Sequence, residues 1–186
     1  MKKLISMLLA LALVLSLAAC GAANTPATEA PTEAPTEAPA VSLTGTLEEL
    51  LYKVIEIQPV EFMGGAMTLD LTDTSEDGLW AIKSFTGLEN AEQISDLAVY
   101  EPMIGAIPFS LAMVRTTEGA DVAAVAANMK NNIDQRKWIC VMADDLQVVS
   151  YGDVVMLIMV GSDTGLTSQA FVDAFAGVCG GEVTVH

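Results

Sequence analysis

Three segments of the chain place apolar residues at helical spacing. The first begins at Thr46-Leu47-Glu48-Glu49, which matches a capping box, and continues to about Ile57. The second spans residues 119–134 and carries positive side chains near its carboxyl end, where they complement the helix dipole. The third spans residues 168–178 and stops at Gly180-Gly181. Each segment has one apolar stripe, which predicts three amphipathic helices that pack on a sheet.

Other segments have the apolar alternation or the β-branched content of strands. They are residues 67–71, 97–100, 107–113, 138–142, 146–150 and 154–160, of which 97–100 and 138–142 carry the weakest signal. Val154 to Val160 contains no polar residue, which predicts a central strand covered on both faces. The preceding Tyr151-Gly152-Asp153 predicts a tight hairpin turn.

From Ile107 onward the predicted order is strand, helix, strands, helix. This order predicts an α+β fold, with about three helices packed on a largely antiparallel sheet. Residues 43–186 are enough for one domain with a real core and too few for two domains of ordinary size.

The amino terminus has the parts of a secretory signal. Lys2 and Lys3 precede an apolar run, which ends in Leu17-Ala18-Ala19-Cys20-Gly21 and is too short and wrongly flanked for a membrane span. The stretch resembles the lipobox of bacterial lipoproteins, in which the cysteine is joined to diacylglycerol. It predicts a signal peptide at residues 1–19, lipidation of Cys20 and a place on the extracytoplasmic face of the cell membrane. The alternatives are an ordinary secretory signal with Cys20 near the cut, or an inserted helix that is never cut.

Residues 20–42 have the composition of a tether. Thr28-Glu29-Ala30-Pro31 is repeated twice more with proline at every fourth position, and no apolar face is present. Proline fixes φ and the glutamates repel one another, so the segment is expected to stay extended and disordered. At roughly 3 Å per residue, such a tether could lift the domain on the order of 60 Å from the membrane.

The chain is strongly acidic. Its formal net charge is −16, and loss of Lys2 and Lys3 with the signal leaves −18, of which −15 belongs to residues 43–186. Such a charge disfavours nucleic acid and anionic headgroups as partners, while cations and cationic peptides or polymers remain possible. The alternative is that the acidic surface serves solubility alone.

Familiar catalytic sets are missing from the predicted domain. Its one histidine is the last residue, His186, where a terminus is expected to fray. No lysine follows its glycine pairs, so no phosphate loop is predicted. Asp144-Asp145 could suggest acid/base work on a glycan, although neighbouring acids before a strand are more often a turn. Cys140 and Cys179 are either a disulfide pair or two separate buried thiols, and we favour the thiols.

One acidic stretch suggests a cation site. Asp73, Ser75 and Asp77 stand at the first, third and fifth places of a calcium-like loop and are followed by glycine, with Asp70 close by. The twelfth place is Ser84 rather than glutamate, so an acidic turn is the simpler interpretation. The rival function built on these residues is a carboxylate- or metal-dependent hydrolase of the cell envelope.

Arg136, Lys137 and Trp138 form the one basic and aromatic cluster of the acidic domain. They are the predicted place for an anionic ligand or partner, although charge at a helix end also explains them.

The stretch from Ile94 to Val160 looks like a domain found in lipoproteins of clostridia and related Gram-positive bacteria, a family described only as a domain of unknown function. The residues that carry the resemblance are Val114-Arg115, Gly119-Ala120-Asp121, Arg136 to Cys140 and Ser150 to Asp153. The resemblance implies a Gram-positive membrane exterior and no particular activity. The predicted anchor, the spacer and the missing catalytic sets favour a non-enzymatic domain without a cofactor, which binds an unknown envelope protein or small ligand or takes part in an envelope assembly.

Overall fold

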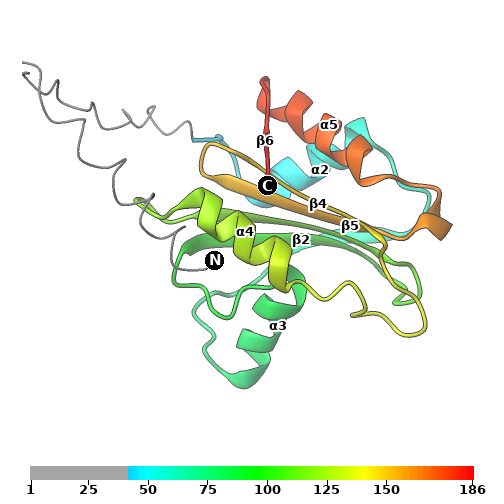
Figure 1. Cartoon of the computed structure of the whole chain (residues 1–186), viewed down its shortest axis with the longest axis horizontal. Coiled ribbons are helices and arrows are strands. Elements are labelled where there is room, and N and C mark those ends of the chain that lie inside the picture. Colours follow the sequence, from blue (N-terminus) through cyan, green and yellow to red (C-terminus); the bar gives the residue numbers. More distant parts are fainter. Residues whose placement is uncertain (1–41) are drawn as a thin grey trace, which may run out of the picture. The chain divides into compact units, whose positions relative to one another are not determined.

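The computed structural model describes residues 42–186, which form an α+β domain built on one antiparallel sheet. The sheet has six strands in the order β1-β2-β3-β5-β4-β6, and every neighbouring pair is antiparallel (Figure 1). The strands are β1 (Gly64–Thr68), β2 (Ile94–Pro102), β3 (Phe109–Thr116), β4 (Asp145–Tyr151), β5 (Val154–Val160) and β6 (Thr184–Val185). The signal segment, Cys20 and the tether as far as Val41 lie outside the described residues.

Helices cover both faces of this sheet. Buried residues of α2 (Leu47–Ile57) and α5 (Ser168–Cys179) pack on one face, and those of α3 (Glu76–Thr86) and α4 (Val122–Asn132) pack on the other. A short 3-10 helix, η1 (Ser162–Thr164), precedes α5. The predicted fold class is therefore confirmed, with four α-helices in residues 42–186 instead of about three.

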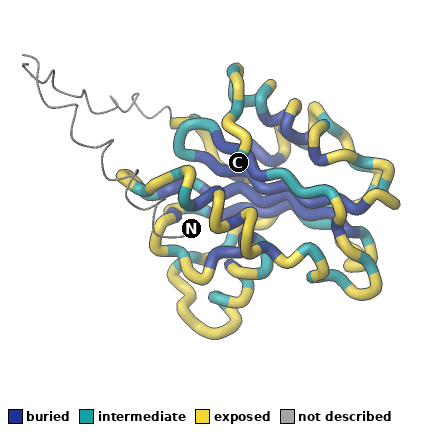
Figure 2. The backbone as a smooth tube through the Cα atoms, viewed as in Figure 1, coloured by how far each residue is buried: buried dark blue, intermediate teal, exposed yellow. Residues whose placement is uncertain are grey.

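The central strands β3 and β5 are buried because they are apolar on both sides (Figure 2). In β5, Val154, Met156 and Ile158 belong to the core under α2 and α5, while the alternate Val155 and Leu157 belong to the core under α3 and α4. All seven residues of β5 are buried, and the strand lies between β3 and β4. The prediction of a central strand covered on both faces is confirmed.

The three predicted helices are present, although α4 is shorter than the predicted 119–134, because Asp121 caps it and it begins at Val122. Thr46 accepts a hydrogen bond from the Glu49 backbone N–H, and the Glu49 carboxylate accepts one from Thr46, so the capping box is complete. Gly180 ends α5 in the left-handed conformation with φ 70°. The predicted hairpin turn also forms, since Tyr151 pairs with Val154 across Gly152, which has φ 59°.

Helix α3 was not predicted, because its sequence lacks a clear apolar periodicity. Gly78 lies in its first turn, and Trp80 is exposed at 69 % and interrupts the apolar spacing. Only Ile82 and Thr86 of this helix are fully buried, so the apolar stripe is narrow.

Two strand predictions were wrong. β1 ends at Thr68, whereas the predicted strand extended to Leu71. Residues 138–142 form an irregular loop in which Cys140 has a φ of 65°, and that conformation is incompatible with a strand. The two-residue β6 was also missed, since Thr184 and Val185 are too few to give a periodic signal.

The sheet has two distinct ends. At one, which we call the hairpin end, the β4–β5 turn lies beside the end of β3, because Thr116 N–H donates to the Asp153 carbonyl. At the other, the loop end, the start of β1 meets the end of β2, and Val160 pairs with both Phe109 and Asp145. The loop end therefore gathers four connecting segments, residues 58–63, 103–108, 133–144 and 161–167.

The described chain begins at the hairpin end. The Asp153 carboxylate accepts hydrogen bonds from Ser42 Oγ at 3.1 Å and from the Leu43 N–H at 3.2 Å. Arg115 Nη1 lies 2.8 Å from the same carboxylate, and its Nη2 donates to the Gly45 carbonyl at 3.0 Å. Arg115 and Asp153 thus fasten the first described residues beside the β4–β5 turn.

Candidate functional site

A hollow of about 580 Å³ opens at the loop end, on the side of the sheet that α2 and α5 cover. Three of the four loop-end segments line it: those before β1, between β2 and β3, and after β5. Its size falls in the range of small-ligand sites. The lining residues are Pro59, Glu61, Phe62, Ala106, Ile107, Pro108, Asp163, Thr164, Gly165 and Leu166.

The floor of the hollow is fixed to the core by aromatic contacts. The Phe62 ring lies edge-on to Phe109 with ring centroids 5.0 Å apart, and Phe109 in turn contacts Phe171 at 5.2 Å and Tyr100 at 6.3 Å. Such pairs add to the energy of burial and fix ring orientation. The hollow is therefore preformed on its Phe62 side.

The rim is held by backbone and glycine geometry. Gly161 N–H donates to the Pro108 carbonyl at 2.7 Å, and a Cβ on Gly161 would collide with the Pro108 ring. Thr164 N–H donates back to the Gly161 carbonyl at 3.0 Å, and Gly165 turns with φ 71°. The segments that carry Pro108 and Asp163 are thus tied together, which fixes one wall against the other.

The hollow combines apolar surface with two carboxylates. Glu61 comes from the segment before β1 and Asp163 from η1, and both residues are exposed. Within residues 42–186, no lysine or arginine lines the hollow, and neither carboxylate takes part in an ion pair. The negative charge at this mouth is accordingly open to a cation from outside.

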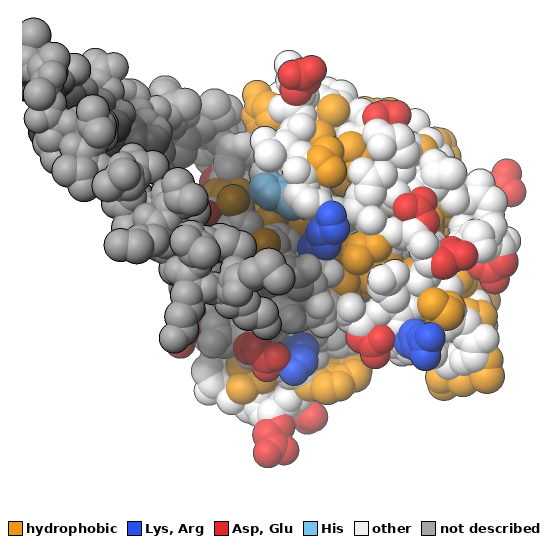
Figure 3. All heavy atoms as spheres, viewed as in Figure 1, with side chains coloured by type: hydrophobic (Ala, Val, Ile, Leu, Met, Phe, Trp, Pro, Cys, Tyr) orange, Lys and Arg blue, Asp and Glu red, His pale blue; other side chains and the backbone are white. Residues whose placement is uncertain are grey.

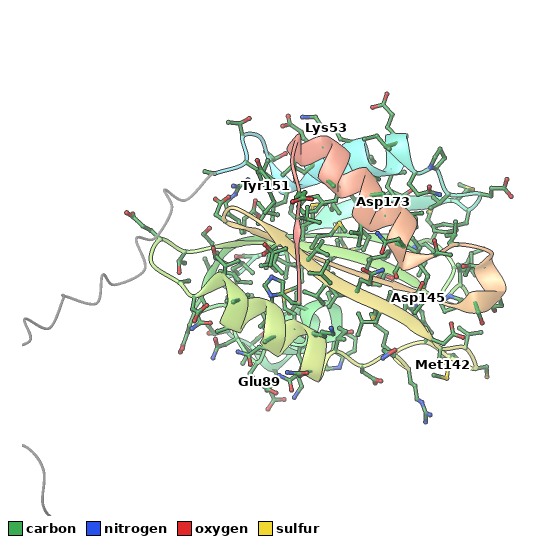
Figure 4. The ribbon with its side chains drawn as sticks, turned by 45° about the horizontal axis from the view of Figure 1, so that its top comes forward. Lys53, Glu89, Met142, Asp145, Tyr151 and Asp173 are labelled. Carbon is green, nitrogen blue, oxygen red and sulfur yellow. The ribbon has the colours of Figure 1, made fainter. Side chains whose placement is uncertain are left out.

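Large apolar side chains are exposed around the loop end. Met63 is exposed at 76 %, Met103 at 73 % and Ile104 at 62 %, and the Met103 N–H donates to the Met63 carbonyl at 2.9 Å. Ile139 and Met142 are exposed in the segment before β4. Figure 4 places Met142 and Tyr151 at opposite ends of the β4–β5 hairpin. Figure 3 shows acidic side chains spread over the visible face, with apolar side chains exposed at its right-hand edge.

Lys137, one of the three predicted ligand residues, is used inside the protein. Its Nζ lies 2.8 Å from Glu101 Oε1 and 2.9 Å from Ser110 Oγ, and Ser110 Oγ donates to the same carboxylate oxygen at 2.5 Å. The ammonium also lies 4.5 Å from the centre of the Phe85 ring and 5.3 Å from that of Trp138. Burial lowers the pKa of Lys137, and the Glu101 carboxylate partly offsets that effect.

Arg136 and Trp138 take no part in the Lys137–Glu101 ion pair, although the Trp138 ring contacts the Lys137 ammonium. They line a shallow hollow of about 340 Å³ with Cys140, Val141 and Met142, and Arg136 is exposed. The structure therefore divides the predicted cluster, because Lys137 points inward to Glu101 while Arg136 stays at the surface. An anionic ligand at Arg136 and Trp138 stays a prediction.

The predicted cation residues lie at the amino terminus of α3. Ser75 is the N-cap, its Oγ accepts from the Gly78 N–H, and Asp73 Oδ1 accepts from the Ser75 N–H at 2.9 Å. Hydrogen bonds from Thr72 and Ser75 hold the pKa values of Asp70 and Asp73 below their ordinary range. Asp70, Asp73 and Asp77 line a small hollow, yet no group of three acidic, histidine or cysteine side chains in residues 42–186 has metal-binding geometry. The stretch serves as a helix cap, and calcium there stays a prediction.

His186 does not fray as expected. Its N–H donates to the Val148 carbonyl at 3.0 Å, its Nε2 lies 2.8 Å from Ser150 Oγ, and its carbonyl accepts from Lys130. Burial and the nearby Lys130 charge lower the pKa of His186, which favours the neutral ring. Ser150 is only 7 % exposed and lies in β4 between β5 and β6, so a substrate has little access to its hydroxyl. The Ser–His contact therefore fastens the sheet edge.

The remaining candidates are also structural. Asp144 Oδ1 accepts from the Ser162 N–H, and the Asp145 carboxylate accepts from both the N–H and the Oγ of Ser168. These acids hold the segment between β5 and α5.

Cys140 and Cys179 are separate free thiols, as favoured, although Cys140 is exposed and only Cys179 is partly buried. Desolvation raises the pKa of the Cys179 thiol to about 12.

Sequence reasoning missed the larger hollow because its walls come from three distant segments. Glu61, Phe62 and Asp163 belong to no motif. The available signal was Met103-Ile104, two large apolar residues in a predicted connection, where polar residues are usual.

None of the helices in residues 42–186 is long and apolar enough to cross a bilayer. No family model, no curated protein and no solved structure matches this chain.

Proposed function

We propose that this protein is a lipoprotein anchored through Cys20 to the extracytoplasmic face of the cell membrane, whose folded domain binds a partner at its loop end and catalyses no reaction. The lipobox-like stretch and the proline-rich segment support the anchor. The observation that carries the binding role is the placement of the hollow, at the end of the sheet opposite to Ser42 and Asp153.

This placement leaves the hollow accessible. β5 spans the sheet from one end to the other with seven residues, which at about 3.3 Å per residue separates the two ends by roughly 20 Å. Ser42, where the connection to the bilayer would begin, lies beside Asp153 at the hairpin end. The connection therefore need not cover the hollow at Phe62 and Ile107. A partner could then reach the loop end while the domain stays attached.

The chemistry of the loop end favours binding over catalysis. The hollow has a fixed apolar floor and two surface carboxylates, which suit recognition of a ligand. Elsewhere in the described residues, Asp73, Asp144 and Asp145 accept hydrogen bonds from the backbone that they cap. Those carboxylates hold local structure, which weakens the rival proposal of a carboxylate-based hydrolase.

Site-specific photo-crosslinking on the full chain in its own membrane tests this proposal. A photo-reactive amino acid replaces Ile104 at the loop end in one variant and Glu118 at the hairpin end in a matched control, since both side chains are exposed. We expect crosslinked species from position 104 and few from position 118. Equal crosslinking from both positions, or none from position 104, would refute binding through the loop end.

Fatty-acid labelling tests the anchor separately. Cells grown with an alkyne-bearing fatty acid should label the wild-type chain and leave Cys20→Ala unlabelled. That variant should also leave the membrane fraction, because one or more acyl chains supply the membrane affinity. Labelling that persists in Cys20→Ala would contradict the proposed lipidation site.

A further inference from the structure

We propose that the hollow at the loop end binds a peptide segment of a partner protein in which an apolar side chain is flanked by lysine or arginine. This inference rests on the proposed function, because it specifies the partner of the same loop end. The apolar side chain would occupy the hollow over Phe62, and the cationic groups would meet Glu61 and Asp163.

The negative charge around the hollow favours a peptide with lysine or arginine beside its apolar side chain. Glu61 and Asp163 come from different walls of the hollow, and no ion pair within residues 42–186 neutralises either one. The surrounding domain adds to their potential, since residues 43–186 carry a formal net charge of −15. Lysine or arginine on a partner would be drawn to this mouth, and an acidic segment would be repelled.

The apolar surface extends from inside the hollow to the exposed methionines beside it, so the ligand must have an apolar part that covers more than the hollow. Inside the hollow, Phe62, Ile107 and Leu166 contact the main core and leave a concave apolar floor. Outside it, Met63 and Met103 are exposed and flank the same segments, and methionine adapts to varied apolar partners. A peptide can fill the hollow with one side chain and cover these methionines with its neighbours, whereas a small amine or polyamine cannot.

Other occupants fit less well. A second copy of this chain would bring another acidic domain against the two carboxylates, with like-charge repulsion between the copies. Anionic headgroups meet the same repulsion. A cationic and apolar peptide is the class that satisfies both surfaces.

Fluorescence anisotropy with synthetic peptides tests the proposal. The full chain is reconstituted in phosphatidylcholine nanodiscs, with empty nanodiscs as the blank. Three labelled hexapeptides share Gly/Ser flanks and contain Lys-Phe-Lys, Glu-Phe-Glu or Lys-Ala-Lys. We expect the first to bind about tenfold more tightly than either of the others, with an affinity that falls as salt rises.

Paired variants locate the site. Glu61→Gln/Asp163→Asn should weaken binding of the Lys-Phe-Lys peptide about three- to tenfold, because two exposed charge contacts are lost. The control Glu118→Gln/Glu182→Gln removes the same charge from exposed positions outside the hollow and should change the affinity less than about twofold. Equal weakening in both pairs would mean that the net charge of the domain, and not the hollow, attracts the peptide.

The other outcomes are equally decisive. Equal binding of the Glu-Phe-Glu peptide would overturn the cationic requirement, and equal binding of the Lys-Ala-Lys peptide would overturn the apolar one. Concentration-dependent dimers that Ile104→Ser abolishes would assign the hollow to a second copy of this chain. If crosslinking at position 104 succeeds while none of the peptides binds, the ligand chemistry is wrong and the binding role of the loop end stands.

Discussion

Replacing Lys137 by methionine would leave a buried carboxylate without its cation. The Lys137 and Glu101 side chains are only 10 % and 13 % exposed, and their charged atoms lie 2.8 Å apart. Methionine keeps most of the apolar length of the lysine, so the lost charge dominates the effect. Removing one partner of a buried ion pair costs about 3–5 kcal/mol in other proteins. Ser110 still donates to Glu101, so we expect about 3 kcal/mol here.

Two further variants separate the charge effect from the packing effect. In Lys137→Met/Glu101→Gln the neutral amide can still accept from Ser110, so the free energy of unfolding should return to within about 1 kcal/mol of the wild type. Lys83→Met breaks an exposed pair with Glu89, in which the side chains are 53 % and 70 % exposed. That control should cost less than about 1 kcal/mol.

Urea unfolding of the full chain measures all three changes. Tryptophan fluorescence reports the transition, because Trp138 lies beside Lys137, and far-ultraviolet circular dichroism checks that the helices melt with it. The midpoint should fall while the slope with urea stays constant. If Lys137→Met costs no more than Lys83→Met, or if the double variant is no more stable than Lys137→Met, the buried pair does not hold the segment before β4.

Three further predictions follow from close contacts and shifted pKa values. Gly78→Ala should lower the free energy of unfolding by about 1–3 kcal/mol, and with it the melting temperature, because the new Cβ would collide with the Asp73 carbonyl at the start of α3. Iodoacetamide at about pH 8 should alkylate Cys140 before Cys179, because Cys140 is exposed and the pKa of Cys179 is raised to about 12; mass spectrometry of the two peptides measures this. Burial and the Lys130 charge hold the pKa of His186 below its ordinary value, so at a pH between the folded and unfolded pKa values the unfolded chain binds a proton that the folded chain does not. The free energy of unfolding should therefore fall as the pH drops below the ordinary pKa of histidine, about 6.5, and His186→Gln should lack this part of the fall in urea titrations.

Each of these three has a matched control. Gly65→Ala should be nearly silent, because nothing lies within 4 Å of the added Cβ, and an equal loss in both glycine variants would contradict the contact argument. In urea both thiols should react alike, so a difference that survives unfolding would rule out burial as its cause. An acid dependence that is identical in wild type and His186→Gln would show that the contact with Ser150 contributes nothing.

Local signals explain which parts of the fold could be predicted. The β4–β5 hairpin depends on neighbouring residues: a strand with Val148 and Val149 at its centre, a turn with Gly152 at φ 59°, and the all-apolar β5. The start of α2 depends on the side chains of Thr46 and Glu49, three positions apart. Interactions of this kind join residues that are close in sequence, so they can be predicted without knowledge of the rest of the chain.

The features that escaped prediction depend on distant residues. Residues 138–142 have strand-like composition, but Lys137 is drawn to Glu101 and Ser110, which are 36 and 27 positions away, and Cys140 takes a positive φ. Tertiary contacts of this kind override local propensity. The hollow likewise depends on which ends of the strands meet, and no single segment shows it.

The surface chemistry of the loop end separates two explanations of the acidic charge. A surface selected only for solubility needs dispersed acids and gains nothing from exposed methionine and isoleucine. Met63, Met103 and Ile104 expose from 62 % to 76 % of their surfaces, and they flank a hollow with a rigid aromatic floor. Exposed apolar groups of this kind favour association, and the acids beside them favour cationic partners. We therefore propose that the acidic charge and the apolar loop end act together, with the first selecting the partner that the second binds.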